Sequence, residues 1–213
     1  MNPPMLRAAR DVHAAAVGPD LVVLDLAGSD YLCFPGLAGA LAGTGLGQPQ
    51  PDAADELVES GLFEWAEDPA PPALDPPELR RTSRDASAGR GGPREAAQFL
   101  AAIFHGRRAF RRHGLTALLT GTPPSEARSH DREALARRAV LFDRWLPWIP
   151  GQGLCLWRAY VLRRFLRAGG LDADWVFGVR TCPFSAHCWL QAGDLLLDDD
   201  LDRVRLYTPL LVA

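Results

Sequence analysis

The chain has 213 residues, of which 47% are hydrophobic and 23% are charged, and its formal net charge is −3. This length is enough for one or two domains with a sizeable buried core. The apolar runs are far shorter than the roughly 20 residues of a membrane-spanning helix, and residues 1–7 lack the apolar core of a signal peptide. The sequence therefore predicts a cytoplasmic protein without a membrane segment.

Residues 1–66 predict a small module of mixed structure. Short apolar runs separated by turn residues indicate three strands, at residues 11–17, 21–26 and 31–34. Pro51 and the acidic residues that follow it are typical of a helix start, so we expect a helix over residues 52–60. Three strands followed by helices make this module an α+β unit.

Residues 67–93 predict an exposed linker, because they hold six prolines and few apolar residues. The charge balance also changes along this part of the chain. Residues 1–79 hold 2 arginines and 13 acidic residues, whereas residues 80–144 hold 14 arginines and 6 acidic residues. This asymmetry predicts two segments with different surfaces.

Residues 94–213 predict a second α+β domain, in which helices precede an antiparallel sheet. Apolar residues recur at the helical period in three segments, one beginning at residue 94 and the others covering residues 130–146 and 154–168. Alternating or apolar runs bounded by turns indicate three strands, at residues 174–180, 184–191 and 194–198.

Cys155 and His187 form the most informative chemical pattern. Cys155 lies in the first turn of the predicted helix 154–168, where backbone N–H groups have no helical partner and stabilise a thiolate. His187 lies in a predicted strand and would supply a base, and a run of acids at residues 198–200 follows the next strand. Cysteine, histidine and carboxylate in this order are typical of a papain-like or transglutaminase-like site.

Asp199 is the predicted carboxylate that orients His187. Strand alternation places Asp198 and Asp200 on the other face, but either of them would serve if the register of the strand differs. Gln152 is a candidate for a second donor to an oxyanion.

These residues also have a structural interpretation. A cysteine on a helix rich in alanine and leucine is usually a small buried hydrophobe, and a single histidine on a strand is usually structural. The joint placement of Cys155, His187 and the acids favours catalysis. The other cysteines, Cys33, Cys182 and Cys188, lack this setting, and the four cysteines predict neither a disulfide framework nor a metal or cofactor site.

Three stretches of the sequence carry a resemblance to a known family. They are residues 153–158, Gly-Leu-Cys-Leu-Trp-Arg; the Gly169-Gly170 pair with Phe-Gly-Val at 177–179; and Phe-Ser-Ala-His-Cys-Trp-Leu-Gln at 184–191, followed by Gly-Asp-Leu at 193–195 and Asp199. Together they resemble the lasso-peptide biosynthesis B proteins, which are leader peptidases with a transglutaminase-like cysteine protease fold. The resemblance is closest to members in which a leader-recognition domain precedes the protease.

The resemblance implies that Cys155 is the nucleophile, His187 the base and Asp199 the orienting acid. Members of the family often have alanine at the position of Cys188 and glutamate at the position of Gln191. Neither difference changes the three residues of the implied triad.

The resemblance also implies a role for residues 1–66. The module is similar to the small winged-helix-like domain that binds leader peptides, in which the leader adds as a strand to the edge of a three-stranded sheet and packs against a helix. The implied leader-binding residues are Tyr31, Leu32, Cys33 and Phe34 on the edge strand and Leu57 on the helix.

The sequence hypothesis is a cysteine endopeptidase that removes the leader of a lasso-peptide precursor and passes the core to an ATP-using, asparagine-synthetase-like cyclase. Two alternatives are a transglutaminase-like transfer of the acyl group to an amine and a non-catalytic scaffold that binds the precursor. The arginine cluster within residues 107–112 predicts a solvated helix end or a docking surface for the partner, and it does not indicate nucleic-acid binding.

Overall fold

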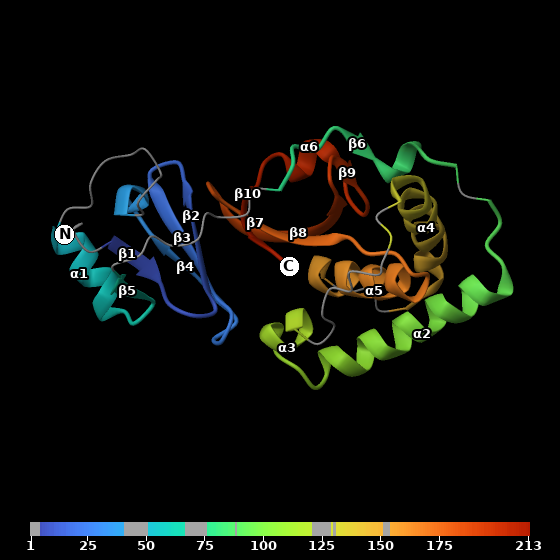
Figure 1. Cartoon of the computed structure of the whole chain (residues 1–213), viewed down its shortest axis with the longest axis horizontal. Coiled ribbons are helices and arrows are strands. Elements are labelled where there is room, and N and C mark those ends of the chain that lie inside the picture. Colours follow the sequence, from blue (N-terminus) through green and yellow to red (C-terminus); the bar gives the residue numbers. More distant parts are fainter. Residues whose placement is uncertain are drawn as a thin grey trace.

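The structure is a computed structural model that describes residues 5–40, 51–66, 76–87, 89–120, 129, 131–150 and 154–213. Figure 1 shows two parts side by side, with the strands and helix of the N-terminal part next to a larger C-terminal part. The carboxyl end of the chain lies near the boundary between the two parts.

The N-terminal part contains the three predicted strands in one antiparallel sheet. They are β2 (Val12–Val17), β3 (Asp20–Asp25) and β4 (Asp30–Phe34), in the order β2-β3-β4. The predicted helix is present as α1 (Pro51–Glu59). A separate two-stranded sheet pairs β1 (Met5–Ala8) with β5 (Phe63–Ala66), and the sequence analysis did not predict β1.

One face of the three-stranded sheet packs within the N-terminal part. Leu21 and Val23 of β3 share a buried cluster with Leu57 of α1, and Leu6 and Phe63 of the two-stranded sheet complete it. Alternation of side chains along β3 sends its other apolar residues to the opposite face.

The opposite face of the same sheet packs against the C-terminal part. Val22 and Leu24 are fully buried and belong to the main core of the molecule, together with Leu26 just after the strand. Thr116 Oγ1 of helix α3 (Leu115–Thr120) donates a 2.8 Å hydrogen bond to the carbonyl of Leu26. The two parts therefore share one hydrophobic core.

The segment predicted as a linker differs from that prediction over its described residues. Arg81–Thr82 form strand β6, which pairs in parallel with β9 (Leu195–Leu196). Leu79 and Ser83 are buried, and Ser83 Oγ donates a 2.7 Å hydrogen bond to the carbonyl of Leu197. Residues near 80 thus extend the C-terminal sheet, because the edge strand β9 offers them backbone hydrogen-bond partners. The proline content of the segment gives no sign of this pairing.

The C-terminal part is built on a five-stranded sheet with the order β10-β7-β8-β9-β6. Strands β7 (Asp174–Thr181) and β8 (Phe184–Ala192) form the predicted hairpin. The third predicted strand is shorter than expected, since only Leu195 and Leu196 pair. Strand β10 (Thr208–Val212) was not predicted; it contains Pro209 and forms the other edge of the sheet.

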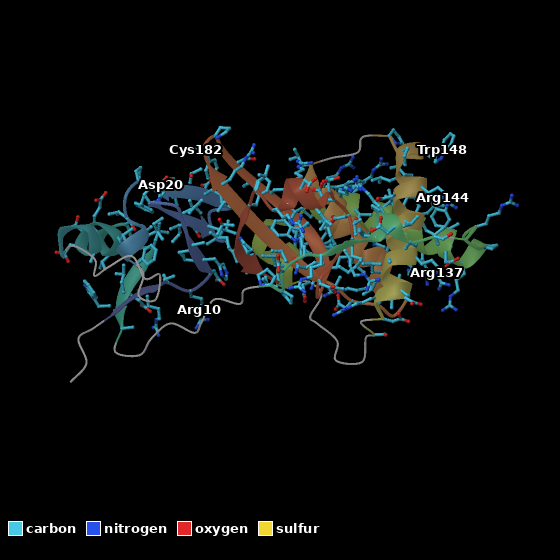
Figure 2. All side chains as sticks on the ribbon, turned by 90° about the horizontal axis from the view of Figure 1, so that it is seen from above. Arg10, Asp20, Arg137, Arg144, Trp148 and Cys182 are labelled. Atoms are coloured by element: carbon cyan, nitrogen blue, oxygen red, sulfur yellow. The ribbon has the colours of Figure 1, made fainter. Side chains whose placement is uncertain are left out.

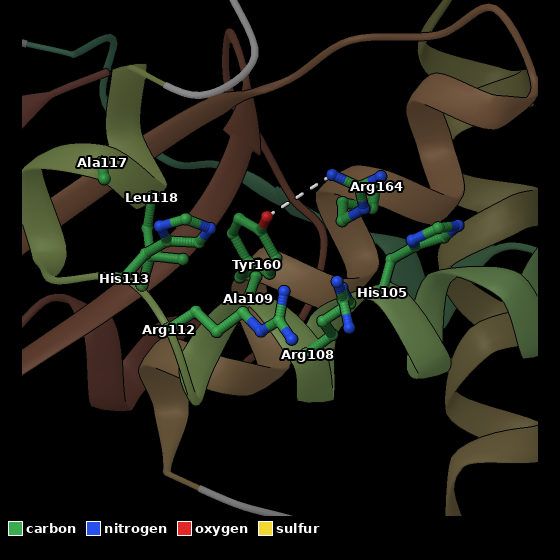
Figure 3. A pocket seen from close by; sticks show the side chains of 9 residues that line it. All are labelled: His105, Arg108, Ala109, Arg112, His113, Ala117, Leu118, Tyr160 and Arg164. Carbon is green, nitrogen blue, oxygen red and sulfur yellow. Dashed lines mark hydrogen bonds between the residues drawn. The ribbon is translucent and has the colours of Figure 1, made fainter.

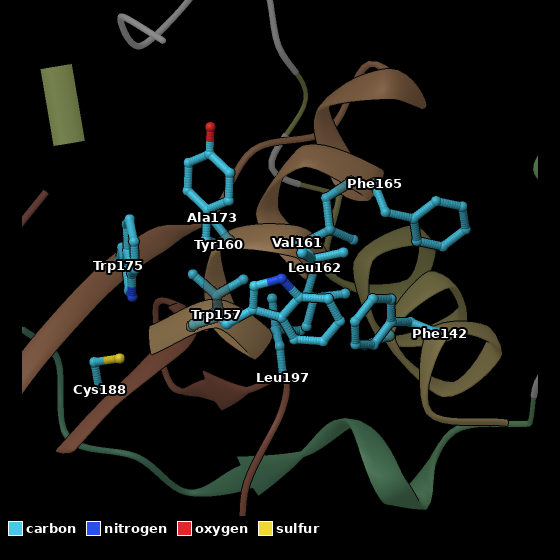
Figure 4. Packing of buried hydrophobic residues seen from close by; sticks show 14 of the residues in the cluster. Phe142, Trp157, Tyr160, Val161, Leu162, Phe165, Ala173, Trp175, Cys188 and Leu197 are labelled. Atoms are coloured by element: carbon cyan, nitrogen blue, oxygen red, sulfur yellow. The ribbon is translucent and has the colours of Figure 1, made fainter. Parts of the chain in front are cut away.

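The predicted helices lie on the main-core side of this sheet and are α2 (Pro93–Phe110), α4 (Arg132–Trp145) and α5 (Cys155–Ala168). The short helix α6 (Leu201–Val204) was not predicted, and it packs in a separate cluster with Val176 and Trp189 of the opposite face. Figure 4 shows the aromatic and aliphatic side chains of α5 packed between the strands and α4. Helices α2 and α5 approach so closely that a Cβ on Gly106 would come within 2.5 Å of Val161. Among the described residues, no helix has the length and apolar character needed to cross a bilayer.

The shared core predicts that a change in the N-terminal sheet destabilises the C-terminal part. Replacing the fully buried Leu24 by alanine leaves a cavity and should lower the free energy of unfolding by about 2–5 kcal/mol. The readout is the urea concentration at which the buried thiol of Cys188 becomes reactive, which should fall in Leu24→Ala. The control is Leu32→Ala, because Leu32 is 39% exposed and should leave that midpoint in place. An unchanged midpoint in Leu24→Ala would contradict a common core.

Candidate active site

Cys155 is the first residue of helix α5. The preceding residue, Leu154, makes no side-chain hydrogen bond that caps the helix, and the N–H groups of the first turn have no partners within the helix. The helix is fixed in place by its apolar face, on which Val161, Leu162 and Phe165 are fully buried. The thiol thus occupies the positive end of a rigid helix.

His187 lies in the middle of β8, and its ring is 4% exposed. Its Nε2 atom hydrogen-bonds to Oδ2 of Asp199, and the ring lies close enough to Cys155 for each group to shift the pKa of the other. Because Nε2 is engaged by the carboxylate, Nδ1 is the ring nitrogen left to face the sulfur. The structure therefore brings together the three residues that the sequence analysis singled out.

The electrostatics of this cluster favour a thiolate beside an imidazolium. The hydrogen bond with the Cys188 side chain lowers the pKa of Cys155 most, burial opposes it, and the His187 imidazole lowers it further, to about 4. Burial alone would lower the pKa of His187, but hydrogen bonds with Asp199 and Cys155 raise it to about 9. Both groups are therefore charged between these two values, and the thiolate is the form of cysteine that can act as a nucleophile.

The three adjacent acids have three different roles. Asp198 is buried and accepts a 2.9 Å hydrogen bond from the backbone N–H of Leu190, and burial raises its pKa to about 7. Asp199 holds His187, and that hydrogen bond keeps the pKa of Asp199 below its ordinary value in spite of burial. Asp200 caps helix α6 and forms an ion pair with Arg84. These residues lie beyond the end of β9, so chain geometry after the strand, and not strand alternation, selects Asp199.

Cys188 is a residue of the site that the sequence analysis set aside. It lies on the face of β8 that packs against α5, where its side chain is buried and hydrogen-bonds with Cys155. This hydrogen bond and burial raise the pKa of Cys188 well above its ordinary value, so it remains a thiol that can donate to the Cys155 thiolate. A sequence signal for this position of Cys188 is strand alternation, which points its side chain to the opposite face from that of His187. In the structure, the helix that begins with Cys155 packs on this face.

Aromatic rings enclose the other side of His187. Trp189 is stacked with its ring centroid 6.2 Å from that of His187, and the Tyr207 ring lies 5.2 Å away. Gly178 is the cross-strand partner of His187, and a Cβ there would come within 2.8 Å of Trp189. A glycine at this position therefore allows Trp189 to lie across β7 and shield His187 from water.

The predicted leader-binding residues lie in two different environments, an edge strand and a buried cluster. Four of them, Tyr31 to Phe34, lie on β4, which is an edge strand of its sheet as expected. Leu57 is fully buried among the side chains of the N-terminal cluster, so its contact with a leader stays a prediction that the exposed surface of this structure does not support. The reason is that the apolar face of α1 is used to cover the sheet. Gln152, the candidate oxyanion donor, lies outside the described residues.

A hollow of about 480 Å³ lies at the end of helix α2. It is shown in Figure 3, and its basic lining residues are His105, Arg108, Arg112, His113 and Arg164. Arg164 is held over the ring of Tyr160 and reaches its hydroxyl at 3.4 Å. Two residues of the predicted arginine cluster, Arg108 and Arg112, therefore line a basic hollow. Cys155, His187 and Asp199 do not line it.

Comparisons with known proteins agree with this geometry. The family model described as the transglutaminase-like superfamily matches residues 97–212, which include Cys155, His187 and Asp199. The microcin J25-processing protein McjB of Escherichia coli is 42% identical over 45 residues, which cover 21% of this chain and 22% of that protein. The match thus spans about a fifth of the length of this curated relative. No solved structure matches the chain.

The pKa of Cys155 predicts unusual reactivity in mildly acidic solution. An ordinary thiol with a pKa of about 8.5 is almost entirely protonated at pH 6, whereas a thiol with a pKa near 4 is almost entirely ionised. The rate of alkylation of Cys155 by iodoacetamide should therefore be nearly constant between about pH 5 and pH 8. In His187→Ala the loss of the imidazolium should raise the thiol pKa and lower the rate at pH 6. A wild-type profile with its midpoint above about pH 8 would contradict the ion pair.

The different settings of Asp198 and Asp199 predict different effects of their replacement by asparagine. Asp199→Asn removes the charge that raises the pKa of His187, so it should lower the alkylation rate of Cys155 at pH 6 by about 10-fold or more. Asp198→Asn keeps an oxygen that accepts the N–H of Leu190, and it should change the rate by less than about 3-fold. The reverse order of effects would show that Asp198 is the partner of His187.

Proposed function

The chain belongs to the transglutaminase-like superfamily, and we propose that it is a cysteine peptidase that removes the leader peptide of a lasso-peptide precursor. Cys155, His187 and Asp199 are the proposed catalytic residues. The observation that carries this proposal is the hydrogen bond of His187 with Asp199, together with the position of Cys155 at the start of a helix close enough to His187 to shift its pKa.

The proposed reaction begins with attack of the Cys155 thiolate on the carbonyl carbon at the leader–core junction. Backbone N–H groups of the first turn of α5 would stabilise the negative charge that develops on the carbonyl oxygen. The His187 imidazolium gives its proton to the departing amine of the core, which leaves the leader acyl group on Cys155 as a thioester. Water then attacks the thioester as His187 takes its proton, and this releases the leader acid and restores the thiolate.

The proposed substrate class is supported by two similarities. The relative from Escherichia coli is named for processing microcin J25, and the sequence resembles the lasso-peptide biosynthesis B proteins. The proposed partners are accordingly a lasso precursor, bound through its leader, and an asparagine-synthetase-like cyclase that receives the freed core amine.

The N-terminal sheet is the proposed binding site for the leader. Strand β4 is at the edge of that sheet, and Leu32 and Cys33 on it are exposed. An extended peptide can add to such an edge through backbone hydrogen bonds, with side chains contacting alternate residues of the strand. The excess of acidic residues in the first 79 positions suits a leader that carries basic residues.

The proposed function predicts cleavage of the cognate precursor at one peptide bond by the wild-type protein. Cys155→Ala removes the nucleophile and should reduce the rate by at least about 1,000-fold, as followed by mass spectrometry of the two products. A mass gain of one water over the two products marks hydrolysis, whereas a new amide on the leader would mark transfer to an amine. Undiminished cleavage by Cys155→Ala would overturn the mechanism, and binding without cleavage by the wild type would identify a scaffold.

A further inference from the structure

Tyr31 connects the N-terminal sheet with the cluster around Cys155. It lies on β4 opposite Leu24 of β3, and like Leu24 it packs against the main core. Its ring makes an edge contact with Phe184 at the start of β8, with a centroid distance of 6.2 Å and an interplanar angle of 62°. Tyr31 is thus a residue of one part that contacts the strand carrying His187 in the other part.

The contact between Tyr31 and Phe184 lies on the face of β8 that also carries Cys188. Phe184, Ala186 and Cys188 alternate along this face, and Cys188 hydrogen-bonds with Cys155. The two parts also approach each other at the β7–β8 turn, which contains Cys182. Burial raises the pKa of Cys33 on β4 most, Asp20 raises it further, and Cys182 lies close enough to add a smaller increase. Figure 2 shows Asp20 and Cys182 on the same side of the molecule.

The environment of the Tyr31 phenol agrees with this position. Burial raises its pKa most, and electrostatic interactions with Cys188 and Cys155 raise it further. Interactions of this kind act strongly only over short distances in a partly buried site. The phenol therefore keeps its proton at neutral pH, and its O–H remains a hydrogen-bond donor.

We propose that Tyr31 forms one wall of the peptide-binding site at Cys155 and contacts the substrate beside the scissile bond. This proposal rests on the proposed function and adds a residue from the N-terminal sheet to the acyl site. The ring limits access to the thiolate, and the O–H donates a hydrogen bond to a carbonyl of an extended peptide. The strand proposed to hold the leader then also forms part of the site that cleaves it.

In this proposal, a peptide bound to β4 reaches Cys155 without a long, flexible segment between the bound residues and the cleaved bond. Residues near Tyr31 hold the substrate at one end, and Cys155 attacks it at the other. Such fixed geometry raises the rate by placing the carbonyl near the thiolate before reaction. The substrate class that fits is an extended peptide whose cleavage site follows closely after the segment bound to β4.

The test uses the full chain with Tyr31→Ala, Tyr31→Phe and a matched control, Phe104→Ala, whose ring is 66% exposed on α2. The first readout needs no substrate. Alkylation of Cys155 by iodoacetamide should become about 3- to 10-fold faster in Tyr31→Ala, because the ring no longer covers the thiolate. It should stay within about 2-fold of wild type in Tyr31→Phe and Phe104→Ala. Cys188 should remain unlabelled in all variants, which excludes general unfolding.

The second readout is cleavage of a short peptide that spans the junction of the cognate precursor and lacks the rest of the leader. Tyr31→Ala should lower kcat/KM for this peptide by at least about 10-fold, and Tyr31→Phe should lower it less. Because the short peptide lacks the leader, a loss confined to leader binding would not change its cleavage.

The outcomes separate this proposal from the proposed function. Unchanged alkylation of Cys155 in Tyr31→Ala would overturn the position of Tyr31 over the thiolate. Faster alkylation with unchanged cleavage of the short peptide would overturn its contact with the substrate. A wild-type protein that leaves the precursor intact would instead overturn the proposed function, whatever the alkylation rates are.

Discussion

The packing of helix α5 across strand β8 is the constraint on which the rest of the site depends. A thiolate at Cys155 needs the positive end of a helix and a neighbouring imidazolium, and both require the helix to be held at one place on the sheet. The fully buried side chains of Val161, Leu162 and Phe165 fix that place, and they leave the first turn at the edge of the core. Local electrostatics then follow, because Cys188 and His187 both lie close enough to the Cys155 sulfur to lower its pKa.

The second feature of the molecule is that the N-terminal sheet β2-β3-β4 is buried on both faces, each face in a different hydrophobic cluster. Leu21 and Val23 of β3 face α1, whereas Val22 and Leu24 face the C-terminal part. A strand buried on both faces has a continuous apolar run, and the sequence Leu-Val-Val-Leu has this pattern. The consequence for function is that the proposed leader-binding sheet is packed against the C-terminal part. A domain joined only by a flexible linker would hold its peptide at variable distances from Cys155, whereas a shared core sets one distance.

Much of the fold was predictable from local patterns. The strands β2, β3, β4, β7 and β8 and the helices α1, α2, α4 and α5 follow from apolar periodicity and from turn residues. The elements that were missed depend on partners far away in the sequence. Strand β6 exists because β9 offers an edge about 115 positions later, and β10 exists because β7 offers the other edge, in spite of a proline. Short strands of this kind have little local signal, since most of their stabilisation comes from the sheet they join.

The sequence by itself determined the predicted chemical type of the site. Cysteine at a helix start, histidine in a strand and acids after the next turn favoured thiol chemistry over a structural role, because the placement of these residue types on a helix and a strand follows from local structure. Only the tertiary structure decided which acid meets His187, since the chain after β9 leaves the strand and places Asp198, Asp199 and Asp200 in three different surroundings. It also buried Leu57, placed Cys188 in the core beside the start of α5 and brought Tyr31 into contact with Phe184 at the start of β8. These positions depend on contacts between distant segments, and no local pattern specifies how two packed surfaces will meet.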